Sequence, residues 1–249
     1  MPVRKLAQLL LQFGRGTWVV ATRFPRLDQA QKGLEFQRWA RQVLAILDIE
    51  VEANAAAPVG FAGLVVSNHL SWLDVLVLQS LMPSSFVAKS EVRRWPLVGW
   101  LSHACATIFV DRSSARSAHA MVDDTAAAIR QGQAVVVFPE GTSSDGQSLG
   151  LFHANIFESA IRARAPVQWL SLRYLDADTG ATATAAHFTG DMTLADSLKQ
   201  VTGSSAIRAR VHIGEQVATQ GHSRKTLALH VHGRIRNQLF GPAHEIHPN

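Results

Sequence analysis

The sequence predicts an α/β fold, in which a mixed, mostly parallel sheet is flanked by helices and preceded by an N-terminal pair of amphipathic helices. Three observations support this prediction. From residue 61 onward, short apolar runs alternate with helical stretches, which is typical of a sheet covered on its faces. Apolar residues make up 47% of the 249 residues and charged residues 17%, which excludes a disordered chain and allows a large core. The N-terminal part is instead patterned as two one-sided helices, so we assign 1–52 to a helix pair and 53–249 to an α/β domain.

The first helix of the pair is predicted by mostly apolar residues that recur with the spacing of one helical face. They are Leu6, Leu9, Leu10, Phe13, Thr17 and Val20. The second helix is predicted after the breaker Phe24-Pro25, where "QAQKGLEFQRWARQVLAILDIEVE" (29–52) is again one-sided. The apolar part of this arm is too short to span a bilayer, which takes about 20 apolar residues, and it lacks the cleavage site of a signal peptide.

The positive charge of the chain is concentrated in this arm. Residues 1–41 carry eight Lys and Arg against two acidic residues, whereas the whole chain has a net charge of +5. Basic flanks, Trp18 and Trp39, and an apolar stripe indicate a helix pair that docks in a membrane interface. Two alternatives stay open: the pair packs on the domain with a solvated basic face, or the basic residues bind the phosphates of nucleic acid. We take the membrane interpretation and expect no nucleic-acid partner.

The elements of the α/β domain follow in order along the chain. Strands are predicted at 61–67, 85–89, 105–110, 134–138, 167–172 and 206–213, the last from strict apolar and polar alternation. Helices are predicted at 72–82, 113–131, 153–164 and 223–239. The one cysteine, Cys105, excludes an internal disulfide and a cysteine metal cluster, and its apolar surroundings indicate a buried small hydrophobic residue.

A candidate site follows the first of these strands, in "VVSNHLSWLDVLVL" (65–78). His69 stands at the carboxyl end of a buried strand, where open α/β sheets place their ligand sites, and Asp74 follows five residues later. Ser71 and Asp74 also have the spacing of a capping box, so Asp74 has a purely structural interpretation as well. The two interpretations are compatible if His69 lies in the turn before the helix. The same spacing recurs from His119 to Asp124 on a polar helix, which we interpret as coincidence.

A histidine held by a carboxylate suits general-base catalysis, because the carboxylate fixes the tautomer and stabilises the imidazolium. The chain contains no Gly-x-Ser-x-Gly nucleophile motif. The base would then activate a hydroxyl group of the substrate, which predicts a transferase rather than a serine hydrolase. A second polar block, "AVVVFPEGTSSDG" (134–146), also begins where a strand ends, and its glycines can free backbone N–H groups for an anion or a hydroxylated head group.

With both blocks in view, the chain resembles the PlsC-like glycerolipid acyltransferases, the lysophosphatidic acid acyltransferase family. "NHLSWLD" is similar to the first family block, and "FVAKSEVRRWPLVGWLSHACATIFVDR" to the second. "FPEGTSSDG" is similar to the third block and "APVQWLSLRY" to the fourth. The blocks occur in the family order, and the resemblance covers residues 61–174.

The resemblance implies roles for particular residues. His69 deprotonates an acceptor hydroxyl, which attacks the thioester of an acyl-CoA or acyl-carrier-protein donor, and Asp74 orients His69. The substrate-binding residues it implies are Arg112, Glu140, Gly141 and Thr142, which bind the head group of the acceptor, and Lys89. No metal and no cofactor are required, an apolar groove holds the acyl chain, and the enzyme sits peripherally or monotopically on the cytoplasmic face of the inner membrane.

The family default for the acceptor is the lysolipid 1-acyl-sn-glycerol-3-phosphate, with phosphatidic acid as product. Two departures open an alternative acceptor. Ser143 stands where the third block usually has arginine, and "FTGDMTLADSL" (188–198) is similar to the branch that acts on lyso-ornithine lipid and other lysolipids. A further alternative is a non-catalytic lipid-binding module on the same fold.

Overall fold

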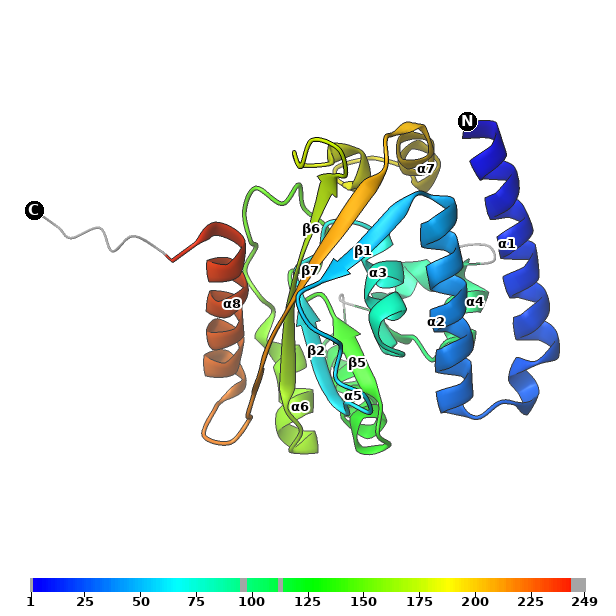
Figure 1. Ribbon diagram of the computed structural model, residues 1–249. Coiled ribbons are helices and arrows are strands. Elements are labelled where there is room, and N and C mark those ends of the chain that lie inside the picture. The colour runs from blue at the N-terminus through cyan, green and yellow to red at the C-terminus, as the bar shows by residue number, and fades with distance from the viewer. Residues whose placement is uncertain (1, 95–97, 112–113, 243–249) are drawn as a thin grey trace, which may run out of the picture.

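The computed structural model describes residues 2–94, 98–111 and 114–242, and these form one sheet with helices on both faces (Figure 1). The strands are β1 (Ile49–Ala53), β2 (Gly63–Ser67), β3 (Ser85–Lys89), β4 (Ile108–Val110), β5 (Ala134–Val137), β6 (Val167–Asp176) and β7 (Ile207–Val217). Their order in the sheet is β1-β7-β6-β2-β5-β3-β4. Among the pairings of these described strands, only β6–β7 is antiparallel. The sheet is therefore mixed and mostly parallel, as predicted.

Helices cover the two faces of the sheet and enclose two cores. One side carries α1 (Pro2–Thr22), α2 (Gln29–Ile46), α3 (Leu73–Leu81), α4 (Val98–Ala104) and α7 (Leu194–Gly203). The other side carries α5 (Ala115–Arg130), α6 (Phe157–Ala163) and α8 (Arg224–Phe240). Short 3-10 turns lie at Phe24–Arg26, Ser90–Arg94, Ala154–Ile156 and Thr184–Ala186. Because side chains alternate along a strand, Val65 faces the first core while Leu64 and Val66 face the second.

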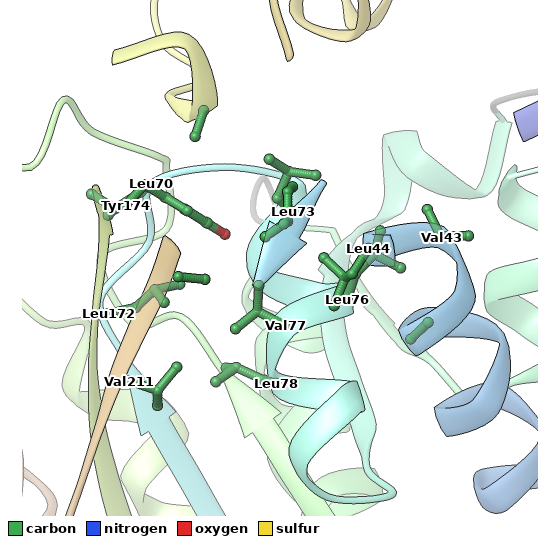
Figure 2. Close-up of a cluster of buried hydrophobic side chains, with 14 of the residues drawn as sticks. Val43, Leu44, Leu70, Leu73, Leu76, Val77, Leu78, Leu172, Tyr174 and Val211 are labelled. Atoms are coloured by element: carbon green, nitrogen blue, oxygen red, sulfur yellow. The ribbon is translucent and has the colours of Figure 1, made fainter. Parts of the chain in front are cut away.

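The first core joins the N-terminal helices to the sheet (Figure 2). Val43 and Leu44 of α2 pack against α3, and Val77 and Leu78 of α3 face the sheet. All four side chains are almost fully buried. Burying a side chain of this size stabilises a fold by about 1.5–3 kcal/mol, so α2 is an integral part of this domain.

The second helix is predicted to run to residue 52, which is too long. The observed helix α2 ends at Ile46, and residues 49–53 form β1, an edge strand parallel to β7. Asp48 makes the turn between them with a φ of 56°. The sequence Ile-Glu-Val-Glu alternates apolar and charged residues, and Glu50 is exposed while Ile49 is buried. The predicted boundary between residues 52 and 53 therefore falls inside a strand of the sheet.

The other predicted elements are present with shifted ends. Strand β4 begins at Ile108 rather than at residue 105, while β6 and β7 continue past their predicted ends to Asp176 and Val217. The predicted helix at 153–164 is the 3-10 turn at Ala154–Ile156 followed by α6. Helices α4 and α7 were not predicted.

Candidate active site

The polar blocks of the sequence come together at one edge of the sheet. Strands β2, β5, β3 and β4 are neighbours and run parallel, so their carboxyl ends lie at the same edge. His69 follows β2, Glu140 and Gly141 follow β5, and Lys89 is the last residue of β3. Arg112 lies outside the described residues.

His69 and Asp74 meet as the capping geometry requires. His69 lies in the turn before α3, and its Nδ1 is 2.7 Å from Oδ2 of Asp74. The same oxygen accepts the backbone N–H groups of Leu70 at 2.7 Å and Ser71 at 3.0 Å. Asp74 is fully buried, while the His69 side chain keeps 22% of its surface exposed, toward the cavity described below. Asp74 thus caps the turn and holds the imidazole.

Only half of the predicted capping box forms. The carboxylate of Asp74 accepts from the backbone of Ser71, but the Ser71 hydroxyl is buried without a hydrogen-bond partner among the described residues. Helix α3 starts at Leu73, and Trp72 occupies the N-cap position in helical backbone geometry. The His69 ring is fixed on its other side by Phe138, which stacks on it at 4.2 Å between ring centroids and 13° between planes. The imidazole therefore has one orientation.

A third residue of this cluster was missed by the sequence analysis. The Tyr174 hydroxyl donates a hydrogen bond to Oδ1 of Asp74 at 2.8 Å, across 100 residues of chain. Burial and then the nearby charge of Asp74 raise the pKa of Tyr174 well above its ordinary value. Figure 2 shows its hydroxyl directed from the sheet toward the start of α3. Tyr174 is the only tyrosine of the chain, and this was the one feature of the sequence that could have drawn attention to it.

The carboxylate of Glu140, to which the family resemblance gives a role in binding the head group, has two backbone partners. Its Oε1 accepts the backbone N–H of His69 at 2.8 Å, and its Oε2 accepts that of Gly150 at 2.8 Å. Burial raises the pKa of Glu140, and these two hydrogen bonds oppose the shift. The residue is 9% exposed and is not part of the cavity wall. In this geometry Glu140 supports the main chain of His69, and its role in binding the head group stays a prediction.

Gly141, Thr142 and Lys89 do reach the cavity wall. Gly141 has a φ of 77°, which suits glycine, and its N–H bonds to the carbonyl of Phe138 at 3.0 Å, closing the turn. Ser143 donates a hydrogen bond to the carbonyl of Phe188. Because the N–H of Phe188 in turn bonds to the carbonyl of Leu70 at 2.9 Å, the segment at 188–190 is tied across the site.

An apolar cavity of about 770 Å³ opens beside His69. It runs between the N-terminal helices and the sheet. Its wall includes Leu9, Phe13, Trp39, Leu76, Phe86 and Leu101. Helices α1 and α2 build a large part of this cavity, and an apolar groove for an acyl chain is what the family resemblance predicts. No group of three or more His, Cys, Asp or Glu within residues 2–94, 98–111 and 114–242 could hold a metal ion.

Comparisons with known proteins agree with this geometry. The Acyltransferase family model matches residues 48–172. A lyso-ornithine lipid O-acyltransferase of Pseudomonas aeruginosa is 33% identical over 242 residues, covering 96% of this chain and 92% of that protein. The chain belongs to the PlsC-like acyltransferase family. A 1-acyl-sn-glycerol-3-phosphate acyltransferase of Neisseria meningitidis is 41% identical to this acyltransferase, over 56% of the chain and 55% of that protein.

The fold of this acyltransferase also has a solved counterpart. The crystal structure of the 1-acyl-sn-glycerophosphate acyltransferase PlsC from Thermotoga maritima aligns with 95% of this chain. The alignment includes 96% of the Thermotoga protein. The TM-score is 0.64 at 21% identity, so the two proteins share a fold. Within the part of the chain that the structure describes, none of the helices has the length and apolar character to cross a bilayer.

Proposed function

We propose that this enzyme moves a fatty acyl group from acyl-CoA or acyl-carrier protein to the hydroxyl of a lysolipid at a membrane surface. The observation that carries the proposal is the His69–Asp74 pair, 2.7 Å apart, opening into an apolar cavity of about 770 Å³. The pair supplies a base, and the cavity has the size of a site that takes a long apolar ligand.

The transfer would use the imidazole twice. Asp74 Oδ2 accepts from Nδ1 of His69, so Nε2 carries the lone pair. Nε2 takes the proton of the acceptor hydroxyl while the hydroxyl oxygen attacks the carbonyl carbon of the thioester. The carbon–sulfur bond then breaks, and the departing thiolate takes the proton from Nε2. The products are the ester and the free thiol, and the enzyme returns to its starting state without a covalent intermediate.

The acceptor that we favour is lyso-ornithine lipid. Two relatives at least 30% identical that match most of this chain carry that name, at 96% and 82% coverage, whereas 1-acyl-sn-glycerol-3-phosphate acyltransferases of two Neisseria species match 56% and 55%. Ser143 also stands at the position where the family block has arginine, which would bind a phosphate more strongly. Its hydroxyl is already hydrogen-bonded to the carbonyl of Phe188. The second candidate is 1-acyl-sn-glycerol-3-phosphate, which the cationic Lys89 in the cavity wall and Arg112 in the sequence favour.

A panel of purified enzyme, both donors and both lysolipids, with products identified by mass, tests this proposal. Wild-type enzyme should esterify a lysolipid, and His69→Ala should abolish the reaction while leaving the circular dichroism spectrum unchanged. His119→Ala is the matched control, because His119 and Asp124 have the same spacing on an exposed face of α5. Vesicle binding without turnover of any lysolipid would instead favour a lipid-binding module.

The membrane surface is proposed from the outer face of α1. Leu10, Leu11 and Trp18 are 68%, 76% and 62% exposed, and the basic residues Arg4 and Arg15 are exposed beside them. Apolar side chains with basic neighbours suit the interface of an anionic leaflet, which here would be the cytoplasmic face of the inner membrane.

Point variants test this docking face more sharply than removal of the helix, because α1 also lines the cavity. Leu11→Glu should weaken sedimentation with anionic vesicles. Leu229→Glu is the control, since Leu229 is equally exposed, at 71%, on α8 across the sheet. Equal loss of binding in both variants, or in neither, would reject α1 as the docking face.

A further inference from the structure

The carboxylate of Asp74 is divided between two tasks. Its Oδ2 receives three donors, namely Nδ1 of His69 and the backbone N–H groups of Leu70 and Ser71. Its Oδ1 receives the hydroxyl of Tyr174 at 2.8 Å, and this is the one hydrogen bond that reaches Oδ1 from the residues that the structure describes. The three donors hold Oδ2 in place, and the Tyr174 hydroxyl anchors the second oxygen and takes up part of its charge.

Tyr174 is well placed to give a fixed direction to that bond. It lies on β6, the strand next to β2, and is paired with Ala209 in the antiparallel register with β7. Its carbonyl also accepts the N–H of Ala183 at 2.9 Å. Tyr174 is 1% exposed and Asp74 0%. A hydrogen bond to a charged group is strong in such water-free surroundings, and a donor on a sheet is held more rigidly than one on a loop.

We propose that Tyr174 is a positioning residue of the acyl transfer: its hydroxyl fixes the plane of the Asp74 carboxylate and takes up part of its charge, and so controls how His69 is oriented and how strongly it binds a proton. This inference rests on the proposed role of His69 as the general base. Tyr174 is not among the residues that line the cavity beside His69, and it acts through Asp74.

The titratable groups around this contact leave Tyr174 a neutral donor. Burial and the charge of Asp74 hold its pKa well above the ordinary value for tyrosine. His187 and Asp145 lie on the far side, where they line a small pocket together with Tyr174. Burial lowers the pKa of His187, which keeps it neutral beside the pair. The Tyr174 hydroxyl therefore keeps its proton and donates a hydrogen bond to Asp74 at neutral pH.

Tyr174→Phe removes the hydroxyl and keeps the ring. The Asp74 charge is then less dispersed and attracts the imidazolium more strongly, so the acid limb of the kcat/KM profile should move to higher pH. The freer carboxylate should lower kcat by about tenfold with little change in KM. Ser159→Ala is the control, because its fully buried hydroxyl bonds to the carbonyl of Ile156 in the other core. It should lower stability without moving the limb. A Tyr174→Phe profile that superposes on the wild type along the pH axis overturns the proposal.

A second measurement needs neither catalysis nor a folded Tyr174 variant. Because the chain has one tyrosine, enzyme grown on tyrosine labelled with ¹³C at Cζ gives a single phenol resonance. In Asp74→Asn this resonance should shift, and the phenol should ionise at lower pH than in the wild type, because the neighbouring negative charge is gone. A tyrosine signal that is unaffected by Asp74→Asn overturns the proposal.

The two measurements separate this inference from the proposed function. Wild-type enzyme that transfers no acyl group to any lysolipid would remove the proposed function, and the kinetic role of Tyr174 with it, even if the NMR coupling is present. An active wild type whose acid limb is unmoved by Tyr174→Phe would leave the acyl transfer standing and remove only the role of Tyr174.

Discussion

The turn between β2 and α3 and the helix α1 both line the cavity, but they are held in different ways. In the turn, the Asp74 carboxylate has four hydrogen-bond donors and the His69 ring is stacked on Phe138. Along α1, one face packs inward through Leu9 and Val20 while the opposite face stays exposed. Groups that transfer a proton need one fixed geometry, whereas a surface that meets lipid needs apolar area rather than fixed partners.

The largest effect should follow from disturbing the turn. Asp74→Asn keeps the shape of the side chain but removes its charge and places an NH₂ group among donors. We expect acyl transfer to fall on the order of 10³-fold, because the imidazole loses its tautomer and the charge that stabilises the imidazolium. Steady-state kinetics measure the loss, with circular dichroism as the check on folding. Activity within a few-fold of the wild type would mean that the turn is no more than a helix cap.

The sequence predicted this turn well because the interaction is local. His69 and Asp74 are five residues apart, and the strand, turn and helix start around them have recognisable patterns. Tyr174 was missed because its contact spans 100 residues and depends on β6 lying beside β2, which no local pattern fixes. The support role of Glu140 was missed because its partners are backbone N–H groups, which leave no trace in the amino-acid types.

The N-terminal arm shows what a local pattern cannot predict. A one-sided apolar pattern predicts a helix, but it does not say which apolar residues face the protein. Leu9 packs inward and Leu10 outward, so the predicted stripe is divided between the core and the surface. The prediction extends the second helix through strand β1, because the alternation in β1 lasts only five residues and directly follows α2. The fold class followed from the repeated strand and helix pattern, while these details depend on packing.

Glu140→Gln should have the next largest effect, and it separates support of the turn from binding of the head group. An amide supplies one acceptor oxygen and one NH₂ group, so one of the N–H groups of His69 and Gly150 loses its acceptor. This should destabilise the fold by about 1–3 kcal/mol and lower kcat. KM for the lysolipid should stay close to the wild-type value. Urea unfolding and kinetics with saturating donor measure both, and a rise confined to KM would support the predicted head-group role.

The packed face of α1 can be tested with two glycines of the same helix. A Cβ at Gly16 would lie 2.7 Å from Nε1 of Trp39, which itself donates to the carbonyl of Gln12 at 3.1 Å, whereas a Cβ at Gly14 meets nothing within 4 Å. Gly16→Ala should therefore destabilise the protein by about 1–3 kcal/mol through overpacking. Gly14→Ala should stabilise it by about 0.5–1 kcal/mol through helix propensity. Thermal unfolding and tryptophan fluorescence distinguish these outcomes, and equal behaviour of the two variants would mean that α1 is not packed in solution.

The smallest effect concerns how the buried turn responds to alkaline pH. The pKa of Tyr174 is raised in the folded protein by burial and by Asp74, so the folded state retains a proton that the unfolded chain releases near pH 10. The resulting stability is complete below the unfolded pKa and is lost as pH rises through the folded one. The slope of this loss for one proton is at most about 1.4 kcal/mol per pH unit. Between pH 9 and 11, the free energy of unfolding of Tyr174→Phe should thus fall less steeply than that of the wild type.

Variants on α1 such as Leu11→Glu should keep the wild-type slope, since they leave the buried phenol untouched. Parallel plots of unfolding free energy against pH for the wild type and Tyr174→Phe would show that the phenol is not buried beside a charge. The conclusion that the turn is held more rigidly than α1 would then lose the hydrogen bond to Oδ1 of Asp74 on which it depends.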